Sequence, residues 1–327
     1  MVLNLLDINA THMTKTTQPR QGSTMDTGLK TAIEDFSQFI QTVNSQEIPV
    51  FKDTFFNKID RIARLIEQSN NEDEWREKFF NMCSTLNDSM LHYRTREKPL
   101  GYAGDFLLID WIYTQKKADS KHGSFFDELF HNFEAARAVR NRKQFFIEKC
   151  KALTSNASGP FTVLDLGCGS CRDVLETFEQ VDNWDNLYFH CVDQEPRAIA
   201  YAEELFKNKP FRHHIHLENS NIFFLHKKQQ YPLIWSAGLF DYLDDRTIRV
   251  LLKKLWRILC PGGSITFGNF SPENPTRNGM ELVGKWFLIH RSAEELLDIA
   301  QNAGIPYSRI DIESEPEGVN LFCTITK

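Results

Sequence analysis

Between residues 28 and 155 the apolar side chains recur at steps of three and four residues. The first stretch contains Ile33, Phe36, Phe39 and Ile40, and the same period returns over 51–66, 75–90 and 125–147. This spacing gathers the apolar side chains on one face of each helix, which packs against a neighbour. The pattern predicts an all-helical domain or lid over residues 28–155. Residues 1–27 are polar after the first few positions and have no such period, so we expect a disordered leader there.

From residue 156 onwards, short apolar runs alternate with amphipathic stretches. The predicted strands cover 161–165, 187–192, 213–218, 233–236, 264–267, 307–312 and 321–325. The predicted helices lie near 171–181, 196–207, 244–259 and 292–303. This alternation predicts an α/β domain over residues 156–327, with a doubly wound, mostly parallel, Rossmann-like sheet of seven strands that binds ligands at its carboxyl ends. No helix separates the last two strands, so we expect a terminal antiparallel hairpin.

The composition narrows the class of protein. A chain of 327 residues with net charge −6 has no broad basic field, which argues against a nucleic-acid partner. The basic run that includes Arg137, Arg140 and Arg142 is typical of a solvated helix face. No apolar run approaches the ~20 residues that span a bilayer, and the first residues lack the features of a signal peptide. Since the cysteines are odd in number and show no disulfide framework, we expect a cytoplasmic protein.

Two clusters raise the question of a metal. Cys168-x-x-Cys171 has no second pair of Cys or His residues at matching spacing, and His213, His214 and His216 lie in a predicted strand. Zinc sites ordinarily need four such ligands. The sequence therefore predicts no metal site.

The first predicted strand of the sheet ends in an acidic residue followed by a glycine loop. Asp165 closes the strand, and Gly167 and Gly169 follow with one residue between them. Glycines allow a sharp turn and a close approach to a ligand. A third glycine of the dinucleotide pattern is absent, because Arg172 stands there, and a carboxylate at Asp165 would repel a pyrophosphate. The loop instead suits a ligand with a cationic amino-acid end, which disfavours a nicotinamide-dependent oxidoreductase.

Further polar residues follow the second and fourth predicted strands. Asp193, with Gln194 beside it, is placed to accept the ribose hydroxyls of a nucleoside, although Asp193 is also suited to cap the next helix. After the fourth strand, Ser236 and Ala237 begin a loop that leads to Asp241 and Tyr242. We expect this loop to face the reacting end of the ligand. Tyr102 lies in the glycine-framed loop 98–105 and is a further candidate contact; the alternative is a plain capped turn.

The segment Asp165-Leu166-Gly167-Cys168-Gly169 resembles the first motif of class I methyltransferases that use S-adenosylmethionine. The resemblance implies that this cofactor is held by Asp165, Gly167, Cys168 and Gly169, with Asp193 on its ribose. It further implies that Asn221 bonds the adenine and that Ile222 lies against the ring, unless Ser220 takes the role by a shift of one residue. Cys171 departs from the commonest form of the motif, which has glycine there.

Longer segments resemble a narrower group, the bacterial methyltransferases that make 3-hydroxypalmitic acid methyl ester. The segments are 98–105, 238–243, 268–275 and 286–291. The resemblance implies methyl transfer to the oxygen of a small-molecule or fatty-acid-like carboxylate. The residues 28–155 would then act as a lid or substrate domain. A homodimer is left open.

The acceptor decides which residues the chemistry needs. A carboxylate is ionised at neutral pH and needs positioning but no general base. The candidates to hold it are Tyr242, Asn269, His290 and Arg291. Arg291 is the natural carboxylate partner because its fork bonds both oxygens, although a surface arginine beside a helix cap is an equal alternative. A hydroxyl or amine acceptor would need Asp241 or His290 as a base, and a catalytically silent protein that binds S-adenosylmethionine is a third alternative.

Overall fold

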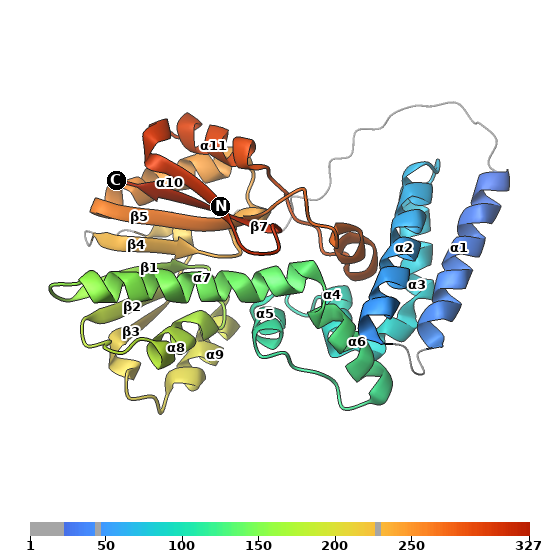
Figure 1. Ribbon diagram of the computed structural model, residues 1–327, viewed down its shortest axis with the longest axis horizontal. Helices are drawn as coiled ribbons and strands as arrows, with labels where there is room; N and C mark the ends of the chain where they lie inside the picture. Colours follow the sequence, from blue (N-terminus) through green and yellow to red (C-terminus); the bar gives the residue numbers. More distant parts are fainter. Residues whose placement is uncertain (1–22, 43–46, 226–229) are drawn as a thin grey trace. The chain divides into compact units, whose positions relative to one another are not determined.

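The computed structural model describes residues 23–42, 47–225 and 230–327 (Figure 1). The chain divides into two compact units. The helical unit contains the chain up to Gly104 together with 117–129 and 278–286, and the sheet unit contains 105–116, 130–277 and 287–327. The division differs from the boundary expected at residue 155, because helices α5 (Phe106–Tyr113) and α7 (Glu134–Asn156) belong to the sheet unit.

The helical unit is built around phenylalanine side chains. Its elements are α1 (Ser23–Gln41), α2 (Ile48–Glu67), α3 (Glu72–Met82), η1 (Ser84–Asp88), α4 (Met90–Glu97), α6 (Lys121–His131) and the π-helical turn η5 (Gly279–Val283). The ring of Phe36 lies 5.3 Å from that of Phe55 and 5.5 Å from that of Phe79, which joins α1 to α2 and α3.

Two boundaries in this unit differ from the predictions. Residues 23–27 form the first turn of α1, so the predicted leader is too long at its end, and residues 1–22 lie outside the described residues. Extending a nucleated helix adds backbone hydrogen bonds at little entropic cost. The helical period predicted over 75–90 is not one continuous helix. Ser89 caps α4 by accepting from the His92 N–H, and it donates its own hydroxyl to Asp127 at 2.6 Å.

The sheet unit has seven strands in the order β3-β2-β1-β4-β5-β7-β6. They are β1 (Phe161–Leu166), β2 (Leu187–Asp193), β3 (Ile215–Asn219), β4 (Tyr231–Ser236), β5 (Leu259–Phe270), β6 (Ile310–Ser314) and β7 (Asn320–Thr326). Strand β7 runs antiparallel to β5 and β6, and the other pairs are parallel. The predicted mostly parallel α/β sheet with a terminal hairpin is confirmed.

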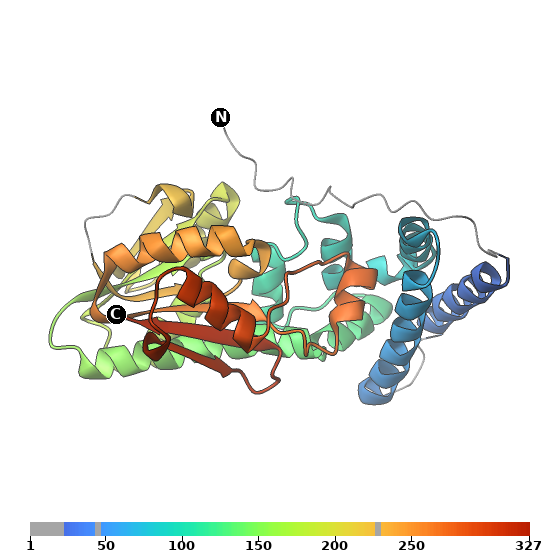
Figure 2. The ribbon, with the colours of Figure 1, turned by 90° about the horizontal axis from the view of Figure 1, so that it is seen from above.

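Helices cover both faces of this sheet. The elements between the strands are α8 (Arg172–Gln180), α9 (Pro196–Phe206), α10 (Asp245–Ile258) and α11 (Ala293–Asn302), with short turns η2 (Arg212–His214), η3 (Ile222–Phe224), η4 (Phe240–Tyr242) and η6 (Tyr307–Arg309). One core joins α7, α8 and α9 to the sheet, and a second joins α10 and α11 to the opposite face, which Figure 2 shows from the side of α10 and α11. Two apolar faces explain why the inner strands are apolar throughout.

Three predicted strand limits shift in the structure. Residues 212–214 and 307–309 form single 3-10 turns, so β3 and β6 begin at Ile215 and Ile310. The strand predicted over 264–267 begins earlier, at Leu259, and contains an irregularity, because Leu259 pairs with Tyr231 while Ser264 already pairs with Leu233. A glycine at φ 76°, Gly262, accommodates the extra residues.

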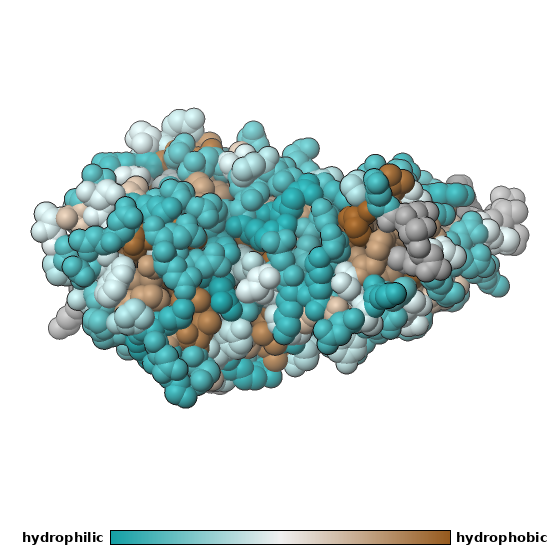
Figure 3. Space-filling model, turned by 60° about the horizontal axis from the view of Figure 1, so that its bottom comes forward, coloured by the Kyte–Doolittle hydropathy of each residue, from teal (hydrophilic) through white to brown (hydrophobic). Residues whose placement is uncertain are grey.

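The surface matches the composition. The face shown in Figure 3 is mostly hydrophilic, with separate small apolar patches, so this face carries no broad apolar region. Within the described part of the chain, none of the helices has the length and apolar character needed to cross a membrane.

Candidate functional site

The loop after β1 is held in an unusual backbone conformation. Gly167 and Gly169 have φ values of 67° and 55°, and Cys171, the residue before α8, has φ 54°. A Cβ atom on Gly169 would lie 3.4 Å from Cβ of Phe106, so α5 packs directly on the loop. At position 171, where the commonest motif has glycine, this chain has a cysteine in the left-handed region. That backbone conformation costs a residue other than glycine about 1–2 kcal/mol.

Helix α5 is fixed above the loop by a buried carboxylate. Asp110 accepts from Arg172 Nε at 2.9 Å and from the Tyr201 hydroxyl at 2.8 Å. These bonds tie α5 to α8 and α9. The predicted cap of α5 is confirmed, since Asp105 accepts from the N–H groups of Leu107 and Leu108.

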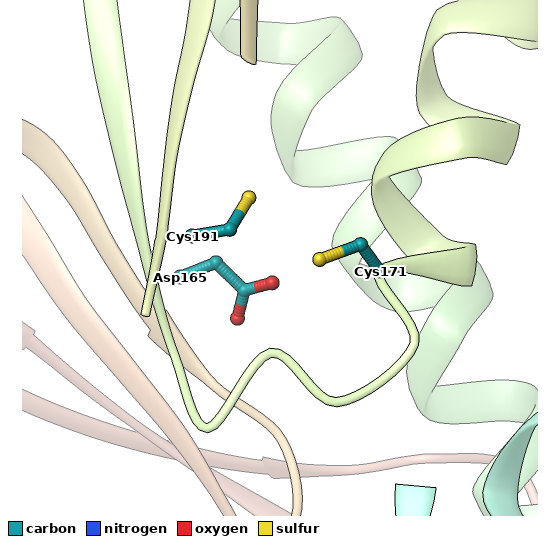
Figure 4. Close-up of side chains that lie close together, drawn as sticks. All are labelled: Asp165, Cys171 and Cys191. Carbon is teal, nitrogen blue, oxygen red and sulfur yellow. The ribbon is translucent and has the colours of Figure 1, made fainter. Parts of the chain in front are cut away.

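Three side chains converge beneath the loop (Figure 4). Asp165 comes from β1, Cys191 from the neighbouring β2 and Cys171 from the loop, and one polar atom of each lies within 4.8 Å of the others. All three are buried. Burial raises the pKa of the Cys168 and Cys191 thiols well above the ordinary value. The contact with Cys168 lowers the pKa of Cys171, but the contact with Cys191 and burial outweigh it and raise the value well above the ordinary one. Burial therefore disfavours the thiolate form, which is the form that binds metal ions.

Asp165 is left with an unsatisfied oxygen. Its Oδ2 atom is buried and has no hydrogen-bond partner among the described residues. Burial, with the nearby carboxylates of Asp173 and Asp193, raises the pKa of Asp165 well above its usual value. A buried acceptor without a donor is costly. An ammonium group bound at this point would satisfy the oxygen and favour the ionised carboxylate.

Asp193 connects the end of β2 to the glycine loop. Its Oδ2 accepts from the Gly169 N–H at 2.9 Å, and its Oδ1 accepts from the Glu195 N–H at 2.8 Å. The residue is half-buried and Gln194 is exposed. Each carboxylate oxygen keeps a second lone pair, so Asp193 has acceptor capacity left for a ligand.

The segment after β3 lies beside Asp193. Ser220 N–H donates to the Asp193 carbonyl at 3.0 Å, and Asn221 caps η3 by accepting from the Phe223 N–H at 2.9 Å. Ile222 is buried. The structure therefore brings Asn221 and Ile222 to the same edge of the sheet as Asp193.

The residues after β4 face a buried arginine. Ser236 donates its hydroxyl to the Leu166 carbonyl at 2.8 Å, which holds the ends of β4 and β1 together. A Cβ atom on Gly238, just beyond Ala237, would lie 3.0 Å from Nη2 of Arg142. The prediction of a solvated basic face is therefore wrong for Arg142, which is 5% exposed.

Arg142 is a cation with unused donors. Its Nε approaches the Tyr113 hydroxyl at 3.5 Å, and within the described chain neither Nη atom donates to a protein acceptor. Burial alone would lower the pKa of Arg142, but Tyr113, Asp241 and Tyr242 outweigh it and raise the value. Arg142 thus stays charged, with its Nη atoms beside Gly238.

The expected acceptor residues form a network of their own. Arg291 donates four hydrogen bonds: from Nη1 to the Phe240 carbonyl and Asn269 Oδ1, from Nη2 to the Leu243 carbonyl, and from Nε to the Asp245 carboxylate. Its Nη2 also lies 2.9 Å from the Asp245 carboxylate as part of an ion pair. Asn269 is fully buried and donates to the carbonyls of Phe270 and Ile289. These contacts already engage the guanidinium within the protein, and the predicted contact of Arg291 with an acceptor carboxylate stays a prediction.

The other predicted residues differ in their surroundings. Asp241 is buried, accepts from the Phe270 N–H at 2.6 Å, and has its pKa raised to about 6, chiefly by burial. Tyr242 and His290 are half-buried, and His290 Nδ1 lies 3.1 Å from the Leu288 carbonyl. Tyr102 belongs to the helical unit, so its role toward a cofactor stays a prediction.

The sequence interpretation missed Arg142 and Tyr113. A signal was present for Arg142, since it lies three residues after Val139 and four before Phe146, both on the buried face of α7. A charged residue within an apolar stripe is the exception that points to a site.

Residues 164–265 match a known family, described as a methyltransferase domain. A search of curated proteins found no match. Among solved structures, one described as a possible exported protein from Bordetella parapertussis is 15% identical with a TM-score of 0.58, covering 95% of this chain and 99% of that chain. At this identity the likeness shows the fold alone.

Two further structures cover a smaller part of the chain. The N-methyltransferase NodS from Bradyrhizobium japonicum, in complex with S-adenosylhomocysteine, is 18% identical with a TM-score of 0.41, over 58% of this chain and 87% of that chain. The magnesium protoporphyrin IX methyltransferase ChlM from Synechocystis, with bound S-adenosylmethionine, is 10% identical with a TM-score of 0.44, over 60% and 84%.

The domain match supports methyl transfer. The cofactor that a methyltransferase domain implies is S-adenosylmethionine, and the unsatisfied Asp165 oxygen fits its ammonium group.

Proposed function

We propose that the protein transfers a methyl group from S-adenosylmethionine to an oxygen of a small-molecule or fatty-acid-like carboxylate. The observation that carries this proposal is Arg142, a buried cation whose Nη atoms lie beside Gly238 and donate to no acceptor among the residues that the structure describes. A guanidinium with unused donors matches a carboxylate in charge and in shape. The loop after β4 is also where a doubly wound sheet binds the reacting end of its ligand.

In this proposal the cofactor is held by the residues predicted from the sequence. Asp165 accepts from the ammonium group, Asp193 and Gln194 contact the ribose, and Asn221 and Ile222 contact the adenine. The loop from Gly167 through Cys168 to Gly169 approaches the cofactor closely. Ser236 acts indirectly, since its hydroxyl is already donated to Leu166, and it positions the following Ala237.

For this reaction the main task of the protein is to position the two reactants. Bound S-adenosylmethionine supplies a methyl group activated by its sulfonium. A carboxylate acceptor is ionised near neutral pH, so Arg142 has only to orient it and to keep water away. Asp241 and Tyr113 also interact with the charge of Arg142. They therefore partly offset its pull on the acceptor carboxylate, which leaves the acceptor oxygen nucleophilic.

Arg142 could bind either of two carboxylates, that of an acceptor or that of the cofactor's methionine portion. Calorimetry distinguishes these two possibilities. Arg142→Gln is compared with wild type for binding of S-adenosylhomocysteine and of 5′-methylthioadenosine, which lacks the methionine carboxylate. The proposal expects unchanged affinity for both. A loss of at least about tenfold for S-adenosylhomocysteine alone would assign Arg142 to the cofactor and remove the support for an acceptor carboxylate.

The acceptor class is tested with labelled methyl groups. The protein is incubated with methyl-labelled S-adenosylmethionine and hexadecanoate, 3-hydroxyhexadecanoate, hexadecanol or hexadecylamine. The expected product is a base-labile ester from the acids alone. Label found only in base-stable amine or ether products contradicts the proposal, and binding without transfer to any compound supports a catalytically silent protein.

A second candidate is methyl transfer to a hydroxyl or amine with a general base. The pKa of Asp241, raised to about 6 by burial, favours this alternative because a base works best near the working pH; His290 is the other candidate. Asp241→Asn keeps the oxygen that accepts from Phe270. It should leave carboxylate methylation within a few-fold of wild type, whereas a base mechanism would lose about a hundredfold or more.

A further inference from the structure

Two histidines and a glutamate meet on strands β2 and β3, away from the cofactor loop. His190 pairs with His216 across the two parallel strands, and Glu218 follows His216 by two residues. Side chains two residues apart in a strand point to the same face, so all three lie on one face. Cys191 belongs to the core with α8 and α9, so its neighbour His190 points to the opposite face.

The polar atoms lie at metal-ligand separations. Glu218 Oε2 is 2.9 Å from His190 Nε2 and 3.7 Å from His216 Nε2, and one ligand atom from each residue lies within 4.8 Å of the others. Ligands bonded to zinc at ~2.0–2.1 Å are about 3.3 Å apart when tetrahedral and about 2.9 Å apart at a right angle. The two observed distances bracket these values, so small rotations of the side chains would bring the three ligand atoms to zinc-binding positions.

His190 already has the outer partner that a metal-binding histidine needs. Its Nδ1 lies 2.8 Å from the Tyr231 hydroxyl, and both residues are buried. Histidine ligands commonly hydrogen-bond through the second ring nitrogen, which fixes the ring and its tautomer. A hydroxyl can donate or accept, so Tyr231 can orient His190 with or without a metal.

The three residues differ in exposure, which leaves one side open. The side chains of His190, Glu218 and His216 are 4%, 26% and 65% exposed. A cavity of about 380 Å³ is lined by His190 and His216 together with the exposed His213. The remaining coordination positions therefore face water. Two neutral imidazoles and one carboxylate favour zinc, cobalt, nickel or copper over magnesium and calcium.

We propose that His190, His216 and Glu218 form a transition-metal site, zinc being the physiological candidate, that joins the edge strand β3 to β2. The site is independent of methyl transfer, since none of its residues is assigned to the cofactor or the acceptor. It holds the metal through two imidazole nitrogens and one carboxylate, with water completing the coordination.

Cobalt is the probe because its spectrum reports its ligands. The full-length protein, treated with a chelator and then dialysed, is titrated with Co²⁺ and then with Zn²⁺ in competition. We expect one equivalent of Co²⁺ with visible d–d bands and no sulfur-to-metal charge-transfer band, and a higher melting temperature with metal bound. Binding with a strong thiolate band would place the metal at the cysteines, and no binding at micromolar metal would equally overturn the proposal.

The variants locate the site. His216→Ala changes an exposed residue and Glu218→Gln is isosteric, so both should fold. Each should weaken binding by more than about a hundredfold, and Tyr231→Phe by roughly tenfold. The matched control is His213→Ala, an exposed histidine three residues away that lies outside the cluster and should bind as wild type. Equal binding by His216→Ala and wild type would disprove the assignment.

Discussion

Replacing Arg291 with glutamine separates a structural role from a catalytic one. The side chain is 3% exposed and donates to the carbonyls of Phe240 and Leu243 and to Asn269 Oδ1. Each acceptor left without a donor in the interior costs about 1–3 kcal/mol. The Phe240 carbonyl keeps the Leu243 N–H as a donor, and glutamine can restore one of the other two bonds. One unpaired acceptor at about 1–3 kcal/mol and one lost hydrogen bond at about 1 kcal/mol give an expected loss of unfolding free energy of ~2–4 kcal/mol. The pair with Asp245 adds little, because that carboxylate is 57% exposed.

The measurement is urea unfolding, followed by tryptophan fluorescence, with methyl transfer assayed on the same preparations. Arg246→Gln is the matched control, since Arg246 is exposed at the start of the neighbouring helix α10 and should change stability by less than about 0.5 kcal/mol. A variant Arg291→Gln that unfolds within about 1 kcal/mol of wild type but no longer methylates carboxylates would refute the structural reading. Arg291 would then be the acceptor contact that its position in the sequence suggested.

Three further predictions concern the loop and its surroundings. Burial raises the pKa of Asp173 from its ordinary value of 3.8 to about 6, so the stability falls as the pH rises through this window. Asp173→Asn should therefore increase the urea midpoint most at about pH 7.5, clearly less near pH 4.5, and not at all below about pH 3.5. Asp193→Ala should weaken S-adenosylmethionine binding in calorimetry by about tenfold or more, and an unchanged affinity would contradict the ribose assignment. Gly169→Ala places a Cβ at φ 55° and 3.4 Å from Phe106, so unfolding free energy should fall by about 1–2 kcal/mol, checked by urea denaturation against Gly159→Ala, where nothing lies within 4 Å.

The strands and turns that carry the proposed cofactor contacts could be predicted because their signals are local in sequence. Asp165 and Asp193 end two adjacent parallel strands, and the residues around them fix both the strand and the turn that follows. The register of β1 and β2 then places the strand ends together. The backbone partners of Asp193, among them the N–H of Gly169, could be identified only from the structure.

The acceptor side could not be predicted in the same way. Arg142 and Arg291 are both buried arginines, and what separates them is the supply of acceptors around each guanidinium. Main-chain carbonyls from η4 and the segment before α10 engage Arg291, whereas Arg142 faces Gly238, which has no side chain to offer. Main-chain carbonyls carry no residue-specific signal, so no pattern of residue types distinguishes the two cases.

The reactivity of the thiols beside the glycine loop can be used to measure whether the loop opens. Because Cys168, Cys171 and Cys191 are buried and burial disfavours the reactive thiolate of Cys168 and Cys191, their reaction with an alkylating reagent would require a local opening that exposes them. Cys260 is partly exposed and reacts without such an event. The ratio of alkylation rates, read residue by residue in a mass spectrometer, therefore gives the frequency of opening. A ligand that closes the loop should slow the buried thiols and leave Cys260 unchanged.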